Sequence, residues 1–375
     1  MSRSLLFVML VAVVLVAVAC APPPAPAPAP AQPEQPAAAE QPPAAPEVQP
    51  ASEIVLYNWS EYIDPEIYTQ FKELTGIDVL EDNFSSNEEM LAKLQGGASG
   101  YALIVPSDYT VAIMIEEGML HKLDHDNIPN LVNLSERFRN VPYDPGNVYC
   151  VPYQWGTTGI GYDSAVIDAP TSWAAIFEPD PNTPWYGRTT MLDDPRESFA
   201  AALTYLGYDI NTTDEKQLQE AKEVLIRAKP GLSGYDSDTF EDLVASGENV
   251  MAHGWNGDFL VAQEDNENVA YVVPEEGGVV WVDNICIPAT ATPEQKLAAE
   301  MFINYLLEPE VGAQLSEYNY YASPNAAAEE ILGEEFLGDP TIYPPPEVLE
   351  KLQYIEPVGE MESLYQRLWD EVKSS

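Results

Sequence analysis

Apolar residues follow two alternating patterns along the chain from residue 53 onward. The run over 53–58 is rich in β-branched and aromatic residues and predicts a strand. Apolar residues at helical spacing follow it, and we expect a helix that begins at Asp64 and Pro65 and ends at Gly76. The next expected elements are a strand over 77–80, a helix opened by Asn87, a strand over 102–105 and a helix over 110–117. Strands that alternate with helices at this spacing indicate an α/β fold with a mostly parallel sheet.

The stretch from Gly277 to Pro288 predicts a later strand that carries chemistry on one face. Period two places Val279, Trp281 and Asp283 on that face. A carboxylate beside an indole is a poor core element, because an unpaired buried charge is costly. The same pair suits an organic cation, which gains from both a counter-charge and an aromatic face. The alternative is a strand end with a core tryptophan and an exposed acid.

Aromatic and hydroxyl side chains follow two of the predicted parallel strands. Trp59 and Tyr62 come after the first strand, and Ser107 and Tyr109 come after the strand over 102–105. Ligands of such sheets bind beyond the carboxyl ends of the strands. We therefore expect both pairs to face one crevice. The alternative for Trp59 and Tyr62 is packing on their own loop.

A second α/β block is expected over 164–280. The glycine-rich segment over 156–161 precedes it and is typical of a chain that passes between two lobes while keeping backbone freedom. Asp194 followed by Pro195 marks another strand end at which a helix begins. An amphipathic helix is expected near 361–372.

The N-terminus resembles an export signal. The apolar run from Leu5 to Val18 is short for a membrane span and predicts a signal peptide over 1–19. A small-residue cleavage site directly before Cys20 resembles the bacterial lipobox, in which that cysteine is acylated; an incidental cysteine is the alternative. Residues 21–51 are almost entirely Pro, Ala, Glu and Gln and cannot bury a core. Residues 20–51 are therefore expected to form a lipidated tether.

The charge balance limits the partners. The chain has 16 basic and 61 acidic residues, a formal net charge of -45. Phosphate binding needs a basic surface, so this balance argues against a nucleic-acid partner and against adhesion of the folded part to anionic lipid. It permits a cationic ligand, although adaptation of the whole surface for solubility or salt accounts for most of the charge.

Two cysteines remain if Cys20 is lipidated. Cys150 and Cys286 both lie in apolar, strand-like runs, so one disulfide and two buried free thiols are both open. The cysteines and histidines lack the spacing of a zinc site, and no metal ion is expected.

Six motifs occur in order along the chain. They are Asn58-Trp59-Ser60-Glu61-Tyr62-Ile63, Val105-Pro106-Ser107-Asp108-Tyr109, the stretch from Tyr153 to Tyr162, Asp194-Pro195-Arg196-Glu197, Gly254-Trp255-Asn256-Gly257 and Trp281-Val282-Asp283. Together they resemble the spermidine/putrescine-binding proteins of bacterial ABC importers, over residues 53–375. The resemblance implies a two-lobed, type II periplasmic-binding-protein fold with a hinge and a ligand cleft between the lobes. Lobe 1 would comprise 52–157 and 282–329, and lobe 2 would comprise 158–281 and 330–375.

The resemblance also implies which residues bind the ligand. The aromatic and hydroxyl members would line the cleft: Trp59, Ser60, Tyr62, Ser107, Tyr109, Trp255, Trp281 and Tyr321. The acidic members would pair with ammonium groups: Asp194, Glu197, Asp258 and Asp283. Asp258 is similar to the putrescine-preferring branch, whereas Trp281 is more like the spermidine-preferring branch. A glutamine that contacts the ligand in the spermidine branch has no clear match near Ile355, so the preferred ligand length stays open.

The expected function is high-affinity capture of a polyamine, spermidine or putrescine, outside the cytoplasmic membrane and its delivery to the permease subunits of an ABC importer. We expect a monomeric, non-enzymatic lipoprotein on the outer face of that membrane, anchored through Cys20, with no cofactor.

Other function classes fit the residues less well. A receptor of the same fold for another cationic solute is the first; a ferric site would need more than the three histidines of this chain. A hydrolase would use Asp194 and Asp283 as an acid/base pair, but no GxSxG, HExxH or Walker motif occurs. A purely structural surface lipoprotein would not need aromatic residues at successive strand ends. The Asp-Ser-Asp sequence over 236–238 is interpreted as a solvated turn, since it lacks the glycine of a calcium loop.

Overall fold

The described part of the protein, in a computed structural model, is residues 48–375, and its elements follow the predicted α/β order. The strands are β1 Glu53–Asn58, β2 Asp78–Asn83, β3 Leu103–Ile104, β4 Cys150–Asp163, β5 Thr189–Met191, β6 Gly234–Tyr235, β7 Met251–Trp255, β8 Val269–Val272, β9 Gly278–Cys286 and β10 Leu352–Gln353. The helices are α1 Pro65–Thr75, α2 Asn87–Gln95, α3 Asp108–Glu116, α4 Ala174–Phe177, α5 Pro195–Leu206, α6 Glu215–Ala228, α7 Phe240–Ala245, α8 Asn256–Asp265, α9 Pro293–Leu306, α10 Pro309–Asn319, α11 Ala326–Leu337, α12 Pro346–Leu349 and α13 Glu362–Ser374. Short 3-10 turns lie at His125–Asn127, Pro129–Asn133, Glu136–Phe138, Lys229–Gly231 and Gly359–Met361.

Helix α1 shows how local sequence sets the element ends. The Asp64 side chain accepts a hydrogen bond from the Glu66 amide (2.9 Å), and Pro65 occupies the first turn, where no amide donor is needed. Gly76 ends the helix in the left-handed region (φ 78°), which a residue without Cβ adopts without strain. The predicted boundaries of this helix are confirmed.

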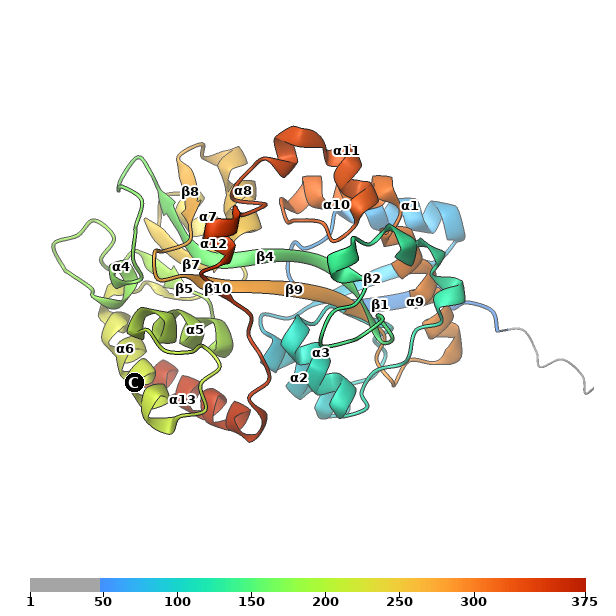
Figure 1. Cartoon of the computed structure of the whole chain (residues 1–375), viewed down its shortest axis with the longest axis horizontal. Helices are drawn as coiled ribbons and strands as arrows, with labels where there is room; N and C mark the ends of the chain where they lie inside the picture. Colours follow the sequence, from blue (N-terminus) through green and yellow to red (C-terminus); the bar gives the residue numbers. More distant parts are fainter. Residues whose placement is uncertain (1–47) are drawn as a thin grey trace, which may run out of the picture. The chain divides into compact units, whose positions relative to one another are not determined.

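The strands form one sheet in the order β2-β1-β3-β9-β4-β7-β5-β6, with β10 beside β9 and β8 beside β4. Pairing is parallel among β1, β2 and β3 and among β5, β6 and β7, but antiparallel wherever β4 or β9 meets these groups. The expectation of a mostly parallel sheet therefore holds at the two ends and not in the middle. In Figure 1, helices α1, α2, α3 and α9 surround β1 and β2, and α4–α8 and α13 surround β5 and β7.

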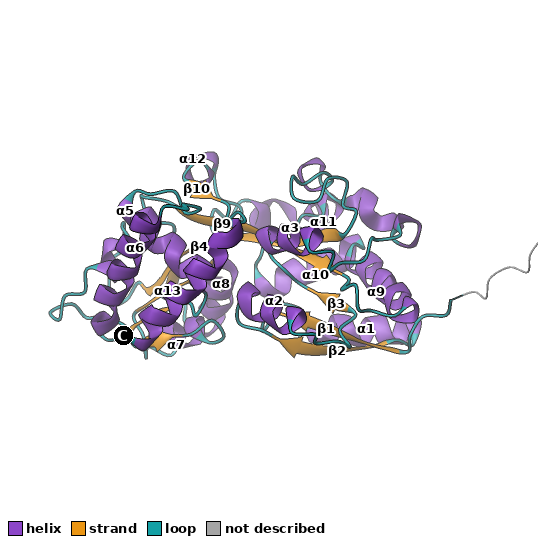
Figure 2. Ribbon diagram, turned by 90° about the horizontal axis from the view of Figure 1, so that it is seen from below, coloured by secondary structure: helices purple, strands orange, loops and turns teal. Residues whose placement is uncertain are grey.

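Two long antiparallel strands, β4 and β9, join the two groups (Figures 1 and 2). They pair from Cys150 opposite Cys286 to Thr158 opposite Val279. Cys150 and Cys286 form a disulfide across this pair, with their Cα atoms 4.5 Å apart. Of the two possibilities that the sequence leaves open, the structure shows the disulfide.

The glycines of β4 have a different role from the predicted backbone freedom. They lie in extended strand, and each permits a close approach that a side chain would block. A Cβ on Gly156 would lie 2.6 Å from the Trp281 ring, and one on Gly161 would lie 2.0 Å from the Phe259 ring. The glycines therefore let rings pack directly on the strand backbone.

The buried apolar side chains form separate clusters on the two sides. The largest surrounds β1–β3, α1 and α9, and a second joins α4, α5, α6 and α13. The two faces of β9 divide as predicted: Val279 and Trp281 belong to the first cluster, and Val280 and Val282 pack with Trp155 in a third.

Several predicted features cannot be compared with the structure, because they fall outside residues 48–375 or concern the assignment of segments to lobes. The signal peptide, Cys20 and nearly all of the tether precede residue 48. Within 48–375, no helix combines the length and apolar character needed to cross a membrane. The predicted lobe boundary at 329/330 falls inside α11, and the assignment of segments to lobes stays a prediction.

Candidate ligand-binding site

A cavity opens where β1, β3, β5 and β7 end, beside the middle of β9. It encloses about 770 Å³ of empty space, part of it open to solvent. Every residue predicted for the ligand site lines it: Trp59, Ser60, Tyr62, Ser107, Tyr109, Asp194, Glu197, Trp255, Asp258, Trp281, Asp283 and Tyr321. Residues separated by more than 200 positions in the chain thus meet at one place, as the strand-end argument predicts.

Asp283 lies on the cavity face of β9 and is fixed by a short polar chain. Its carboxylate accepts a hydrogen bond of 2.6 Å from the Ser107 hydroxyl. Asn87 holds that serine in turn, donating to its Oγ (2.9 Å) and accepting from its amide (3.0 Å). Burial raises the pKa of Asp283 to about 7, and the Ser107 hydrogen bond opposes this only in part. Asp283 is 5% exposed, so the alternative of an exposed strand-end acid is wrong.

Asp194 and Glu197 occupy the first turn of α5. Asp194 caps the helix by accepting from the Glu197 amide (2.9 Å). Glu197 accepts from the Thr158 hydroxyl (3.1 Å) through one oxygen, while its other oxygen is buried without a hydrogen-bond partner among residues 48–375. Burial raises the pKa of Glu197 to about 8. Burial, followed by the charge of Glu197, also raises the pKa of Asp194.

Aromatic rings form the rest of the lining. Trp59 meets Trp255 edge-on with ring centroids 5.5 Å apart, and its indole N–H donates to the Val105 carbonyl (2.9 Å). Tyr321 meets both Tyr62 (5.3 Å) and Trp281 (5.1 Å) in the same edge-on manner. The alternative that Trp59 packs only on its own loop is therefore wrong, because its ring reaches across to the strand end of β7.

Asp258 lies in the first turn of α8, where it accepts a hydrogen bond from the Tyr321 hydroxyl (2.9 Å). Gly257 makes this approach possible, since a Cβ there would lie 2.7 Å from the Tyr321 ring. Asn256 anchors the turn by accepting from the Thr157 amide (2.8 Å). Burial raises the pKa of Asp258 above its ordinary value.

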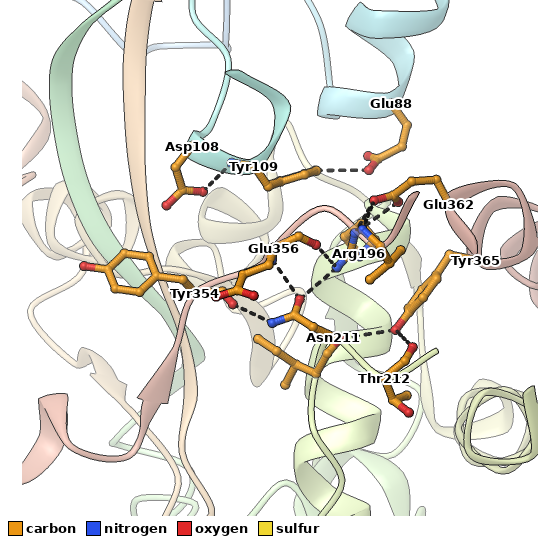
Figure 3. A network of polar contacts seen from close by, with 12 residues as sticks. Glu88, Asp108, Tyr109, Arg196, Asn211, Thr212, Tyr354, Glu356, Glu362 and Tyr365 are labelled. Atoms are coloured by element: carbon orange, nitrogen blue, oxygen red, sulfur yellow. Dashed lines mark hydrogen bonds and ion pairs between the residues drawn. The ribbon is translucent and has the colours of Figure 1, made fainter. Parts of the chain in front are cut away.

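Arg196 ties the site to the C-terminal part of the chain (Figure 3). Its guanidinium is buried, binds both oxygens of Glu362 (2.8 and 3.0 Å) and donates to the Glu356 carbonyl (3.0 Å). It also lies over the ring of Tyr109 at 5.4 Å, and the Tyr109 hydroxyl donates to Glu88 (3.0 Å). The Arg196 guanidinium is therefore already paired within the protein. It also holds Tyr109, which lines the cavity, close to the segment before α13.

Sequence reasoning missed part of the lining: Glu61, Phe84, Asn87, Asp108, Ser237, Asp238, Phe240, Glu241 and Ile355. The stretch over 236–238 was expected to be a solvated turn. Asp238 is exposed as expected, yet its carboxylate accepts from the hydroxyls of Ser60 (3.1 Å) and Ser85 (3.2 Å), and Ser237 is buried. The amino acids alone carry no sign of this contact, because Ser60 and Asp238 are 178 positions apart.

The described residues offer no obvious metal centre. No group of three or more His, Cys, Asp or Glu side chains within 48–375 is arranged to hold a metal ion. His253 lies outside the cavity, buried against Trp173 with ring centroids 5.4 Å apart. Burial lowers the pKa of His253 to about 3, so it is neutral.

The chain is similar in sequence and structure to known proteins. The family model for bacterial extracellular solute-binding proteins matches residues 66–343. The spermidine/putrescine-binding periplasmic protein of Escherichia coli K12 is 37% identical over 324 residues, which cover 86% of this chain and 91% of that protein. A Streptococcus pneumoniae spermidine/putrescine ABC transporter substrate-binding protein is 34% identical (TM-score 0.69), and a Treponema pallidum lipoprotein is 32% identical (TM-score 0.73). Each of these alignments covers 86% of this chain, with 99% and 100% of the respective solved chains. The predicted two-lobed fold and the resemblance are confirmed, and the chain belongs to the family of bacterial extracellular solute-binding proteins.

Proposed function

We propose that the protein captures a polyamine, spermidine or putrescine, outside the cytoplasmic membrane and delivers it to the permease of an ABC importer. The observation that carries this proposal is a set of buried or half-buried carboxylates that form no ion pair with the described residues. Asp194, Glu197, Asp258 and Asp283 all line the cavity, and none forms an ion pair with the described residues. A cation that supplies ammonium groups at several points would complete them.

The aromatic lining suits the remainder of such a ligand. A polyamine is a methylene chain with charged nitrogens, and rings such as Trp255 and Trp281 contact methylenes while offering a π-face to ammonium. Charge-assisted hydrogen bonds from the nitrogens to the carboxylates would fix its position. The names of the relatives, which describe spermidine and putrescine binding, support the same ligand class.

Direct titration tests the proposal. Putrescine, spermidine and spermine are added to the purified protein, and binding is followed by calorimetry and tryptophan fluorescence. We expect saturable binding and a loss of at least about thirtyfold in Asp283→Asn, because removing one partner of a buried charge pair costs about 2–5 kcal/mol. Asp168→Asn, which removes an exposed carboxylate outside the cavity, is the matched control. Absence of saturable binding, or unchanged affinity in Asp283→Asn, would reject the proposal.

The location follows from the N-terminus and the family. We propose that cleavage after Ala19 exposes Cys20 for acylation and that the Pro/Ala-rich tether separates the folded part from the membrane. The lipoprotein among the solved relatives supports this anchor. Metabolic labelling with a radioactive fatty acid should mark the wild type and not Cys20→Ala, which should be released into the soluble extracytoplasmic fraction.

Lobe assignment and oligomeric state complete the proposal. Lobe 1 (52–157 and 282–329) and lobe 2 (158–281 and 330–375) would close on the ligand as a monomer. Small-angle scattering should show one protomer whose radius of gyration decreases on addition of spermidine. An unchanged radius would reject closure, and a doubled mass would reject the monomer.

A further inference from the structure

Glu241 is a cavity residue whose carboxylate the protein leaves without a partner. It lies in the first turn of α7 and is 7% exposed. Its side chain forms no hydrogen bond with another residue and no ion pair within 48–375, although it lines the same cavity as the predicted site. Such a group is costly to bury, so its retention at this place points to an external cation.

The packing of α7 holds Glu241 rigidly. The preceding residue, Phe240, meets the rings of Trp255 (5.6 Å) and Phe259 (5.3 Å) edge-on. Gly254 admits the phenylalanine, since a Cβ at that position would lie 2.1 Å from its ring. The carboxylate is therefore carried into the cavity by a fixed element and not by a mobile loop.

Asp258 shares this end of the cavity with Glu241. Burial and then the charge of Asp258 raise the pKa of Glu241. Burial likewise raises the pKa of Asp258, which the Tyr321 hydroxyl stabilises as an anion. A buried and a half-buried carboxylate this close cannot both ionise readily without a positive charge between or beside them.

The other acidic groups of the cavity are linked to Asp258 through neighbouring residues. Tyr321 contacts Asp258 and packs on Trp281, which lies two residues before Asp283 on the same face of β9. The charge of Asp283 contributes in turn to the raised pKa of Glu197. Through these contacts, five of the cavity carboxylates form three successive groups: Glu241 with Asp258, then Asp283, then Glu197 with Asp194. Glu61, Asp108 and Asp238 line the cavity beside them.

We propose that Glu241 forms, with Asp258, a subsite for a primary ammonium group, and that this subsite selects a linear triamine over a diamine. The inference rests on the proposed function. Three acidic positions match two terminal ammonium groups and one inner amine, whereas a diamine can fill only two of them. Glu241 would break no covalent bond of the ligand. It would lose its proton to solvent on binding and pair, as a carboxylate, with the ammonium charge.

The test compares Glu241→Gln with Asp242→Asn. Both changes remove one carboxylate from α7, but Asp242 is exposed and outside the cavity. Calorimetry measures the binding of spermidine and putrescine to each full-length variant. We expect the wild type to prefer spermidine. Glu241→Gln should lose about tenfold or more of its spermidine affinity, the loss of a charged hydrogen bond, while putrescine affinity changes less than about threefold. Asp242→Asn should bind both ligands as the wild type does.

Two further measurements separate ligand pairing from a structural role. Glu241→Gln should unfold at an equal or higher temperature than the wild type without ligand at pH 8, because a neutral amide replaces a buried carboxyl whose pKa burial and Asp258 raise to about 9. Spermidine binding should also release fewer protons in Glu241→Gln, measured in buffers of different ionisation enthalpy. A lower unfolding temperature together with equal losses for both ligands would show a structural role and overturn the inference.

The remaining outcomes are also decisive. Wild-type preference for putrescine, or unchanged spermidine affinity in Glu241→Gln, overturns this inference and leaves the proposed function standing. If the wild type binds neither amine, the proposed function fails and the inference fails with it.

Discussion

Two walls of the cavity are built in opposite ways. The wall after β1 consists of Trp59 and Tyr62, whose rings pack on other rings and whose indole N–H is satisfied by the Val105 carbonyl. The wall at the start of α5 consists of Asp194 and Glu197, which are buried but form no ion pair with the described residues, since Arg196 pairs with Glu362. The rings of the aromatic wall are packed within the protein, and only the Tyr62 hydroxyl lacks a hydrogen-bond partner among the described residues, whereas the acidic wall needs a cation. The two walls therefore have opposite effects on the stability of the ligand-free protein. Aromatic packing stabilises that fold, whereas buried carboxylates destabilise it.

Neutralising the acidic wall should have the largest effect on affinity. In the double variant Asp194→Asn/Glu197→Gln, we expect polyamine affinity to fall at least about a hundredfold, since about 2–5 kcal/mol is lost per buried charge pair. Asparagine can still cap α5, so the helix is retained. The ligand-free variant should unfold at a higher temperature at pH 8, measured by circular dichroism. A lower temperature would contradict the contrast between the walls.

The pH dependence of affinity should come next. The folded, ligand-free pKa values are about 7 for Asp283 and about 8 for Glu197, and unfolded carboxyls titrate near 4. Between about pH 4 and 8 the folded state therefore binds more protons than the unfolded state, so the ligand-free free energy of unfolding falls as pH rises through this window. Ammonium binding needs the ionised carboxylates, so affinity should rise by at least about tenfold from pH 6 to pH 8.

Thermal unfolding across this pH range checks the predicted fall in stability, and calorimetry checks the predicted rise in affinity. The ligand-free protein should be more stable at pH 5.5 than at pH 8, and saturating spermidine should reverse or flatten this order. Affinity that does not change with pH would mean that the carboxylates of the acidic wall do not ionise on binding.

Removing an aromatic ring should affect affinity less and stability more. Trp59→Ala should lower affinity by about tenfold, as expected for lost contact with methylenes and ammonium. The same change should lower the free energy of unfolding by about 3–5 kcal/mol, because a large buried ring is removed. Chemical denaturation of the ligand-free protein measures this cost, and Trp59→Phe should recover most of it. A Trp59→Ala protein of undiminished stability would show that the aromatic wall is not self-supporting.

The smallest effect on affinity should come from the disulfide, which belongs to neither wall. In Cys150→Ala/Cys286→Ala, we expect a loss of about 2–5 kcal/mol in unfolding free energy, because the bond closes a loop of 136 positions. Polyamine affinity should change less than about threefold. A large loss of affinity would mean that the β4–β9 pair itself sets the cavity geometry.

The sequence predicts elements whose causes are local and fails where the cause is distant. The boundaries of α1 follow from Asp64, Pro65 and Gly76, and the two faces of β9 follow from its period of two. Glu241 is different, because one acid in a first helical turn is ordinary in any sequence. Its place in the cavity depends on Phe240 packing against Trp255 and Phe259, contacts that no local pattern contains.

The same limit explains two other outcomes. Tight packing gives the glycines of β4 their role, and a sequence shows only that a side chain is absent, not which ring lies against the backbone. The pairing of Cys150 with Cys286 depends on the register of two strands far apart in the chain. The ligand-site residues could be predicted because strand ends of a parallel sheet converge and because the motifs occur in a recognisable order.

The buried Arg196 has a consequence for how the C-terminus can be altered. Its main partner, Glu362, begins α13, and Lys229 donates to the carbonyls of Val372 and Ser375 at the end of that helix. Proteolytic trimming of α13 would therefore unpair Arg196 beneath Tyr109, although the cavity lining ends at Ile355. An affinity tag on this end would compete with the same contacts, so tags and fluorophores belong on the exposed face of another helix.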